Sequence, residues 1–262
     1  MTLPIYQVDA FTGKLFGGNP AAVVPLDKWL DDETMQMIAA ENNLAETAFF
    51  VKEGNNYHIR WMTPLKEVNL CGHATLASAF IIFNYIEKEI QKINFNSRSG
   101  ILSVERKGEH LTLDFPSNKP LPARRPAGIS ECFDRELVEI LEGGEFLFLV
   151  FDSEEYIRNY QPNFELLKQL HPIHMIITAP GKSSDFVSRM FAPNLGINED
   201  PVTGSAHTVL TPYWSEKLGK QELLARQLSK RGGELICENL GNRVKISGKA
   251  VLYLTGNIFL YF

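Results

Sequence analysis

The pattern of apolar and polar residues predicts many short strands and few long helices. Residues 4–11, "PIYQVDAF", alternate as a half-buried strand does, and residues 101–115 predict a hairpin that turns at Lys107 and Gly108. A chain rich in strands with few long helices is typical of the α+β class. Other predicted strands are "PAAVV" after a glycine turn, "LAETAFFV", "YHIRWM", segments near 145–151 and 173–178, and the Gly-punctuated end of the chain.

Four segments predict helices. Residues 31–42 carry acids in their first turn and an apolar face, so they predict an amphipathic helix, and a further helix is expected around 162–170. Residues 72–86, "GHATLASAFIIFNYI", are apolar nearly all round. A helix without a polar face must be buried on all sides. A second, mostly apolar helix is expected after Gly204, where Pro212 should remove one hydrogen bond and bend it.

The two halves of the chain share a weak internal repeat. Arg60-Trp61-Met62-Thr63-Pro64 resembles the segment from Arg189 to Pro193, and Gly72-His73-Ala74 resembles Gly204-Ser205-Ala206. The repeat predicts two similar halves, each a sheet around one central helix, in which His73 and Ser205 are equivalent. The alternative, chance similarity, stays open at this point.

Composition restricts the class of protein. The 262 residues carry a net charge of −5 without a basic tract, which argues against nucleic acid as a partner. No apolar stretch approaches the length of about 18 residues that spans a membrane, and the N-terminus lacks the pattern of a signal peptide. The three cysteines are far apart, so reduced thiols and a cytoplasmic location are expected.

The stretch "EDPVTGSAHT", residues 199–208, predicts a rigid turn that opens a helix beside an acid. Pro201 stiffens the chain, Gly204 permits a sharp turn, and Thr203 and Ser205 are common N-cap residues. The unpaired amides of a helix N-terminus can bind a carboxylate. The alternative is that Thr203 and Ser205 only cap the helix.

Four side chains are candidates for chemistry, each with a structural alternative. Asp200 is either a working acid or a solvated loop residue, and Glu46 is either a buried acid or a strand residue that faces solvent. His73 is either a functional imidazole or a capping or core histidine. Cys71 is either a thiol whose pKa is lowered at a helix N-terminus or a small buried filler.

Other kinds of site find little support. His171 and His174 have Pro172 between them and no third ligand nearby, so no metal is expected. The chain lacks a glycine-rich dinucleotide or P-loop fingerprint, so no cofactor is expected. Ser205 lacks the flanking glycines of a nucleophile elbow.

Six motifs in order, between residues 5 and 258, carry a resemblance to the PhzF-like phenazine-biosynthesis family. They are "FGGNPAAVV", "NNLAETAFF", "LCGHATLASA", "FAPNLGINEDPVTGSAHTVLTPYW", "QLSKRGGEL" and "GKAVLYLTGNI". The resemblance implies a diaminopimelate epimerase-like α+β fold. In this fold two pseudo-symmetric halves each form a β-barrel-like mixed sheet around a central buried helix, with the active site between them.

The resemblance also implies domains, site residues and partners. The N-terminal half is expected at residues 1–117 with a returning strand at 251–262, and the C-terminal half at 118–250, with the Pro-rich segment 116–128 as a linker. A small carboxylate is the expected partner, and a homodimer is a family-level expectation. The implied acid/base residues are Glu46, His73 and Asp200, and the implied substrate-binding residues are Asn19, Gly72, Thr203, Gly204 and Ser205.

The family's named reaction is the isomerisation of a dihydro-hydroxyanthranilate without a cofactor. The hypothesis for this chain is therefore a cofactor-independent isomerase in which Glu46 shuttles the proton, assisted by His73 and Asp200. Epimerases of this fold use two cysteines, but only Cys71 is present here, and its counterpart is expected at or near Pro201. An amino-acid epimerase or racemase, and a catalytically silent small-anion-binding protein, remain the alternatives.

Overall fold

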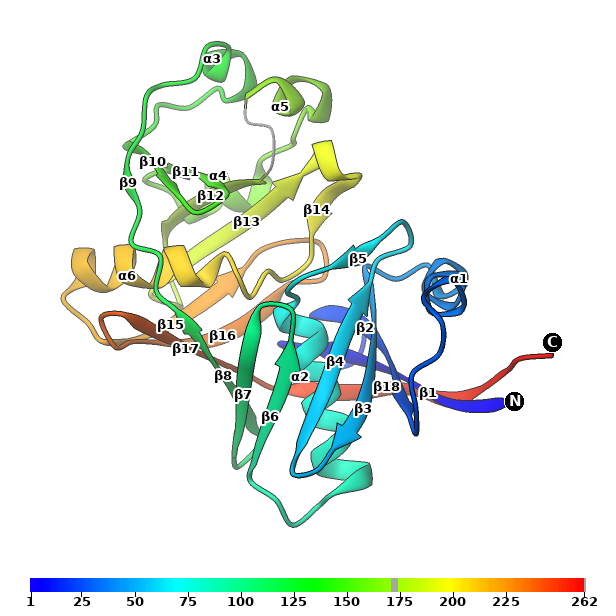
Figure 1. Cartoon of the computed structure of the whole chain (residues 1–262). Helices are drawn as coiled ribbons and strands as arrows, with labels where there is room; N and C mark the ends of the chain where they lie inside the picture. The colour runs from blue at the N-terminus through cyan, green and yellow to red at the C-terminus, as the bar shows by residue number, and fades with distance from the viewer. Residues whose placement is uncertain (171–173, 262) are drawn as a thin grey trace. The chain divides into compact units, whose positions relative to one another are not determined.

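The computed structural model of the chain describes residues 1–170 and 174–261 (Figure 1). His171, which with His174 forms the pair for which no metal is expected, lies outside this range. The chain divides into two compact units, Met1–Asp114 with Ser247–Phe262 as unit 1 and Phe115–Ile246 as unit 2. The sequence analysis expects the boundaries after residues 117 and 250.

Unit 1 is a mixed sheet that contains one amphipathic and one buried helix. The helices are α1 (Asp32–Asn42) and α2 (Gly72–Ile81), the latter continued by a π-helical turn (Ile82–Ile86). Its strands are β1 (Thr2–Ala10), β2 (Asn19–Leu26), β3 (Glu46–Glu53), β4 (Asn56–Met62), β5 (Glu67–Val68), β6 (Lys92–Ser97), β7 (Gly100–Lys107), β8 (His110–Pro116) and β18 (Ala250–Phe259).

Unit 2 is also a mixed sheet with helices. Its helices are α3 (Ile129–Cys132), α4 (Glu154–Asn159), α5 (Phe164–Leu170) and α6 (His207–Leu218), with a 3₁₀ turn at Pro193–Leu195. Its strands are β9 (Leu121–Pro122), β10 (Glu139–Gly143), β11 (Phe146–Val150), β12 (His174–Pro180), β13 (Phe186–Ala192), β14 (Ile197–Asp200), β15 (Glu222–Gln227), β16 (Gly233–Asn239) and β17 (Arg243–Gly248).

Strand pairing follows the same order in both units. In unit 1, β1–β2 is antiparallel, β2–β3 parallel, β3–β4 antiparallel, β4–β6 parallel and β6–β7 antiparallel. In unit 2, β10–β11, β11–β12, β12–β13, β13–β15 and β15–β16 repeat that alternation. The long helix lies in each case in the parallel crossover, α2 between β4 and β6 and α6 between β13 and β15. The predicted α+β fold of two pseudo-symmetric halves is therefore confirmed.

Helix α2 is the buried centre of unit 1. It packs against β1, β2 and β3, and Figure 1 shows it behind β3 and β4. Nine of its ten residues are buried, and most of these are small: glycine, alanine, serine or threonine. Small side chains let the surrounding strands approach the helix closely. The helix that lacks a polar face is thus enclosed by its sheet, as the sequence predicts.

Helix α6 runs through Pro212 without interruption. Proline has no N–H group for the carbonyl four residues earlier. That carbonyl, on Thr208, accepts instead from the backbone N–H of Asn118 at 3.0 Å. The predicted loss of one helical hydrogen bond is therefore compensated by the segment that follows β8.

The predicted linker, residues 116–128, is attached to unit 2 over part of its length. Strand β9 pairs with β10, and the Ala123 amide donates to the Ile140 carbonyl at 3.0 Å. Proline is tolerated in so short an edge strand, so part of the linker segment pairs with the sheet. Across the described residues, no helix is both long enough and apolar enough to span a membrane.

Candidate active site

Four predicted or candidate residues of unit 1 meet at one end of its parallel strands. Asn19 opens β2 and Glu46 opens β3, and these two strands run parallel with Ala21 opposite Glu46. The amino ends of β2 and β3 therefore lie side by side. Cys71 is the N-cap of α2, and His73 lies in its first turn.

The His73 imidazole is the centre of this cluster. Its Nε2 lies 3.1 Å from Oε2 of Glu46, and its Nδ1 lies 3.2 Å from Nδ2 of Asn19. The Cys71 sulfur lies 3.5 Å from Nδ1. These contacts fit the tautomer whose Nε2 proton faces Glu46 while the Asn19 amide donates to Nδ1. In the imidazolium, the amide would turn its oxygen toward the Nδ1 proton.

The neighbours of His73 favour its charged form. Burial alone lowers the pKa of the His73 imidazole, but its contacts with Cys71 and the Glu46 carboxylate outweigh burial and raise that pKa to well above its ordinary 6.5. Burial, followed by the charge of Glu46, raises the pKa of the Cys71 thiol to about 11. The thiol is therefore protonated at neutral pH, which leaves Glu46 as the charge that acts on His73.

Of the two alternatives for Cys71, a thiol of lowered pKa is not supported, because the pKa of the thiol is raised. A helix N-terminus stabilises a thiolate only to the extent of a partial charge. In this cluster, complete burial and a carboxylate nearby outweigh that effect. The alternative, a small buried side chain, describes Cys71 better.

The Glu46 carboxylate is enclosed but accessible. Its side chain is 13% exposed, which contradicts the alternative of a strand residue that faces bulk solvent. Within the described part of the chain, Oε2 has no aligned hydrogen bond, although His73 Nε2 is only 3.1 Å away. A carboxylate oxygen in this position is near a stabilising cation and still has a lone pair that can accept a proton.

Glu46, Cys71 and His73 have the side chains of a metal site, and their ligand atoms lie within 4.8 Å of one another. However, they approach different nitrogens of one ring. Glu46 faces Nε2, whereas the sulfur is 4.0 Å from Nε2 and closer, at 3.5 Å, to Nδ1. A metal ion on one nitrogen would need all three groups to converge there, so this cluster fits acid/base chemistry better than metal binding.

Unit 2 contains a second polar cluster around Asp200, at the end of β14. Asp200 is 8% exposed, so it is not a solvated loop acid. The Thr203 hydroxyl donates to its Oδ2. The side chain of Gln227 bonds the Asp200 carbonyl at 2.8 Å and the Thr203 hydroxyl at 3.1 Å. Asp200 and Thr203 are thus held in one buried network.

The structure corrects the predicted role of Thr203. Helix α6 begins at His207 with Ala206 as its N-cap, and no side chain caps it. The Thr203 amide donates to Oε1 of Gln227 at 2.8 Å, so it is not available to an anion. The His207 and Thr208 amides instead bond the Gly204 and Ser205 carbonyls, which makes a tight turn before the helix. Substrate binding by Gly72, Gly204 and Ser205 stays a prediction.

A repeated ion pair aligns the two clusters in sequence. Arg60 holds both carboxylate oxygens of Glu67, through Nε at 2.8 Å and Nη2 at 2.7 Å. Arg189 holds Glu199 in the same way, at 2.7 and 2.9 Å. Glu67 and Glu199 are separated by the same number of positions as the glycines of the two helix-opening motifs.

That spacing makes Thr203 the counterpart of Cys71. The position expected for the second cysteine, at or near Pro201, is therefore corrected by two residues. The side chain at this position is a hydroxyl that contacts a carboxylate in unit 2 and a thiol that contacts an imidazole in unit 1. A pair of thiols is not available in either case.

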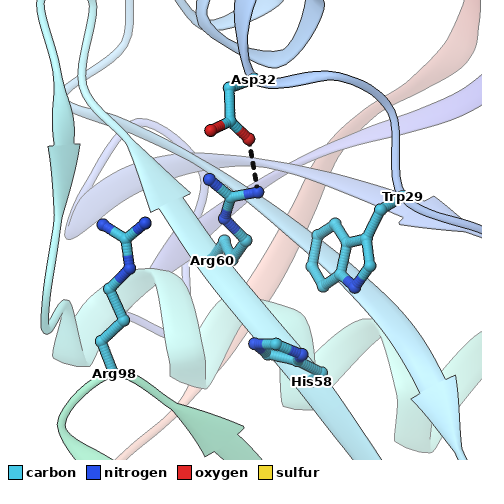
Figure 2. Close-up of a pocket in the computed structure, with 5 residues that line it drawn as sticks. All are labelled: Trp29, Asp32, His58, Arg60 and Arg98. Atoms are coloured by element: carbon cyan, nitrogen blue, oxygen red, sulfur yellow. Dashed lines mark hydrogen bonds and ion pairs between the residues drawn. The ribbon is translucent and has the colours of Figure 1, made fainter.

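A pocket of about 350 Å³ in unit 1 lies over the first of these ion pairs (Figure 2). Figure 2 shows Arg60 bonded to Asp32, with Trp29 and His58 beside it. The Trp29 ring lies 5.5 Å from the Arg60 guanidinium, and Arg98 bonds Glu67 at 2.8 Å. Both arginines are neutralised by carboxylates, and neither Glu46 nor His73 lines the pocket, so we interpret it as structural.

Gln227 was missed by the sequence analysis. The signal that could have found it is a polar residue at an inward position of an alternating strand. Leu223, Ala225 and Gln227 are the buried positions of β15, whereas the residues between them are more exposed. A glutamine among buried positions needs partners for its amide, and here the 200–203 turn supplies them.

Comparisons with known proteins find similarity over almost the whole chain. The family model of phenazine biosynthesis-like proteins (PhzC-PhzF) matches residues 8–256. An uncharacterised isomerase of Pseudomonas aeruginosa is 50% identical and covers 99% of this chain and 100% of its own. The crystal structure of a PhzF family protein from Enterococcus faecalis has a TM-score of 0.96 at 48% identity, over 99% and 100% of the two chains.

A more distant structure shows the fold alone. A probable proline racemase from Agrobacterium radiobacter has a TM-score of 0.66 at 8% identity, over 99% of this chain and 93% of its own. The epimerase-like fold expected from the sequence is therefore present.

Proposed function

Because the chain belongs to the phenazine biosynthesis-like family, we propose that it is a cofactor-independent isomerase that moves a proton between carbons of a small carboxylate. The observation that carries the proposal is the Glu46–His73 pair, in which the buried Oε2 of the carboxylate lies 3.1 Å from an imidazole of raised pKa. The named reaction of the family is the isomerisation of a dihydro-hydroxyanthranilate, and a compound of this kind is the model substrate.

In the proposed reaction, one proton moves from a substrate carbon to Glu46 and from there to a different substrate carbon. The Glu46 carboxylate accepts a proton from an acidic C–H bond, and the electron pair moves into the conjugated system of the substrate. His73, with its Nε2 proton toward Glu46, stabilises the ionised carboxylate before transfer and after return. Glu46 then gives the proton to a different carbon, so atoms and electrons balance without a cofactor.

The remaining predicted residues have supporting parts in this proposal. The first-turn amides of α2, beginning at Gly72, are proposed to bind a substrate carboxylate, because the first N–H groups of a helix have no partner within the helix. Asn19 supports His73 through Nδ1. Asp200 is proposed as a second acid/base group or charge stabiliser, and its replacement by asparagine tests that part separately.

Deuterium exchange tests the role of Glu46. A dihydro-hydroxyanthranilate is incubated with the protein in D₂O, and both product and label at carbon are followed by NMR. Glu46→Gln has the same size but cannot take a proton, and turnover should fall by at least about 100-fold. Glu53→Gln, at the other end of β3, is the matched control and should keep full turnover. Undiminished turnover in Glu46→Gln would remove the proposal.

The same assay separates the alternatives. An amino-acid epimerase would put deuterium at Cα of a free amino acid, but this reading has little support because the two equivalent positions hold a protonated thiol and the Thr203 hydroxyl. A silent binding protein would bind small carboxylates without hydrogen exchange. The predicted homodimer and cytoplasmic location stay predictions, the first of which sedimentation would test.

A further inference from the structure

We propose that Gln227 is a positioning residue, which fixes the Asp200 carboxylate and the Thr203 hydroxyl in the geometry that the reaction uses. This inference rests on the proposed function, because it assumes that Asp200 takes part in proton transfer. Gln227 itself is not proposed to touch the substrate.

The sheet places Gln227 beside the Asp200 turn. Gln227 is the last residue of β15, which runs parallel to β13 with Gln227 opposite Ser188. Farther along the same edge of β13, Met190 pairs with Asp200 of β14, while β12 takes the opposite edge. The side chain of Gln227 is buried, at 1% exposure for the residue, and it extends to the 200–203 turn.

The partners of Gln227 determine the orientation of its amide. A carbonyl oxygen can only accept, so the contact with the Asp200 carbonyl at 2.8 Å must come from Nε2. A backbone N–H can only donate, so the contact with the Thr203 amide at 2.8 Å must use Oε1. With the amide reversed, Nε2 would face the N–H of Thr203, which is also a donor, and Oε1 would face the carbonyl of Asp200, which is also an acceptor. One side chain therefore ties both ends of the turn.

The same amide determines the direction of the Thr203 hydroxyl. Nε2 of Gln227 also donates to Thr203 Oγ1, at 3.1 Å. Since that oxygen accepts from Gln227, its own proton is directed to Oδ2 of Asp200. The Asp200 carboxylate is thus held by a donor whose orientation depends on Gln227.

The rest of the turn has one further anchor from the same region. Ser229 donates through its hydroxyl to the Pro201 carbonyl at 2.7 Å. Ser229 lies two residues after Gln227, just past the end of β15. This short segment therefore holds the turn at Asp200, Pro201 and Thr203. A change of residue 227 is therefore expected to lower the rate of catalysis, although Gln227 is not proposed to touch the substrate.

Two variants and a matched control test the inference. Gln227→Met keeps the length of the side chain but removes all three hydrogen bonds, and Thr203→Val removes only the hydroxyl. Thr178→Val is the control, because Thr178 is a buried threonine of unit 2 whose hydroxyl bonds Val187 and Trp214 instead. Each variant is assayed well below its melting temperature, with a dihydro-hydroxyanthranilate as substrate, and amide hydrogen exchange at residue 203 is measured in parallel.

The expected results differ between the variants. Gln227→Met should lower kcat about 100-fold with a smaller change in KM, and it should lose most of the exchange protection at residue 203. Thr203→Val should lower kcat about tenfold and keep that protection, because the bond from its amide to Gln227 remains. Thr178→Val should keep both kcat and protection. If Gln227→Met does not fold, the contrast between Thr203→Val and Thr178→Val decides.

The outcomes also separate this inference from the proposed function. If Asp200→Asn lowers kcat but neither Gln227→Met nor Thr203→Val does, the positioning role is refuted while the proposed reaction stands. If Glu46→Gln keeps full turnover, the proposed function fails instead. Equal losses of kcat in Thr203→Val and Thr178→Val would show that only stability was changed, and would also refute the positioning role.

Discussion

His207 should make the protein sensitive to acid in a way that can be calculated. Its ring is completely buried in unit 2, where Nδ1 donates to the Thr203 carbonyl at 2.8 Å and Phe186 packs beside it. Within the described residues, Nε2 has no hydrogen-bond partner. Burial therefore lowers the pKa of His207 from 6.5 to about 4.

The sign and size of the effect follow from this difference. Above pH 6.5 the ring is neutral in both the folded and the unfolded chain, so it does not change stability. Between pH 6.5 and 4 the unfolded chain binds a proton that the folded chain does not, and the free energy of unfolding falls. The loss is about 2 kcal/mol at pH 5 and approaches about 3 kcal/mol below pH 4.

The perturbation is His207→Asn, whose amide can still donate to the Thr203 carbonyl but does not titrate. Urea unfolding is measured between pH 7 and pH 4.5 and followed through Trp214, which lies in the same unit, in chains where Trp29 and Trp61 are phenylalanine. The variant should be less stable at pH 7 because of the lost ring volume. Its stability should then fall by about 2 kcal/mol less than that of the reference on going to pH 5.

His58→Asn provides the control, because that ring is 35% exposed and lies in unit 1. Because Trp214 reports on unit 2, the unfolding curves of this variant should match those of the reference. If the reference and His207→Asn lose stability equally between pH 7 and pH 5, then His207 is not the group that resists protonation, and the reasoning from its burial is refuted.

Three further predictions concern other parts of the chain. Iodoacetamide should alkylate Cys71 about 300-fold more slowly than a free cysteine, because a pKa of about 11 leaves little thiolate, and mass spectrometry measures the rate; a rate equal to that of a free cysteine would contradict the raised pKa. Gly18→Ala should lower the free energy of unfolding by about 3 kcal/mol, since φ is +62° and the new Cβ would lie 2.1 Å from the Ala10 carbonyl oxygen. Gly54→Ala, at a similar φ but in open space, should cost only about 1 kcal/mol in the same urea titration, and equal losses would be inconsistent with the clash. Arg189→Met should cost about 3–5 kcal/mol by denaturant unfolding, because it leaves a partly buried carboxylate and two carbonyls without their donor; a loss below about 1 kcal/mol would show that this ion pair does not stabilise the unit.

The features that could be predicted from sequence are those with a local signal. The central helices are visible because residues 72–81 and 207–218 contain few polar positions that could face water. The repeat was visible as short similar segments, but the observation that makes it physical is the pair of arginine–glutamate bridges. Those bridges link adjacent strands in each unit, and sequence spacing alone does not show that pairing.

The features that could not be predicted depend on residues that are distant in sequence. The raised pKa of Cys71 comes from burial by several strands and from Glu46, 25 positions earlier. The amide of Thr203 is occupied by Gln227, which follows 24 positions later. Local pattern suggested an anion site and a helix cap at Thr203, and a tertiary hydrogen bond overrides both. Helices α3 and α4 are too short for a periodic signal.

The closing strand of unit 1 has a consequence for synthesis on the ribosome. Strand β18 pairs with β1 along its length, from Thr2 opposite Phe259 to Ala10 opposite Ala250. A nascent chain therefore exposes the edge of β1 until β18 is translated, whereas unit 2 is continuous and can be completed earlier. The half that is made first must be completed by a strand made after unit 2, so a chain that stops before β18 would leave an open edge that invites aggregation.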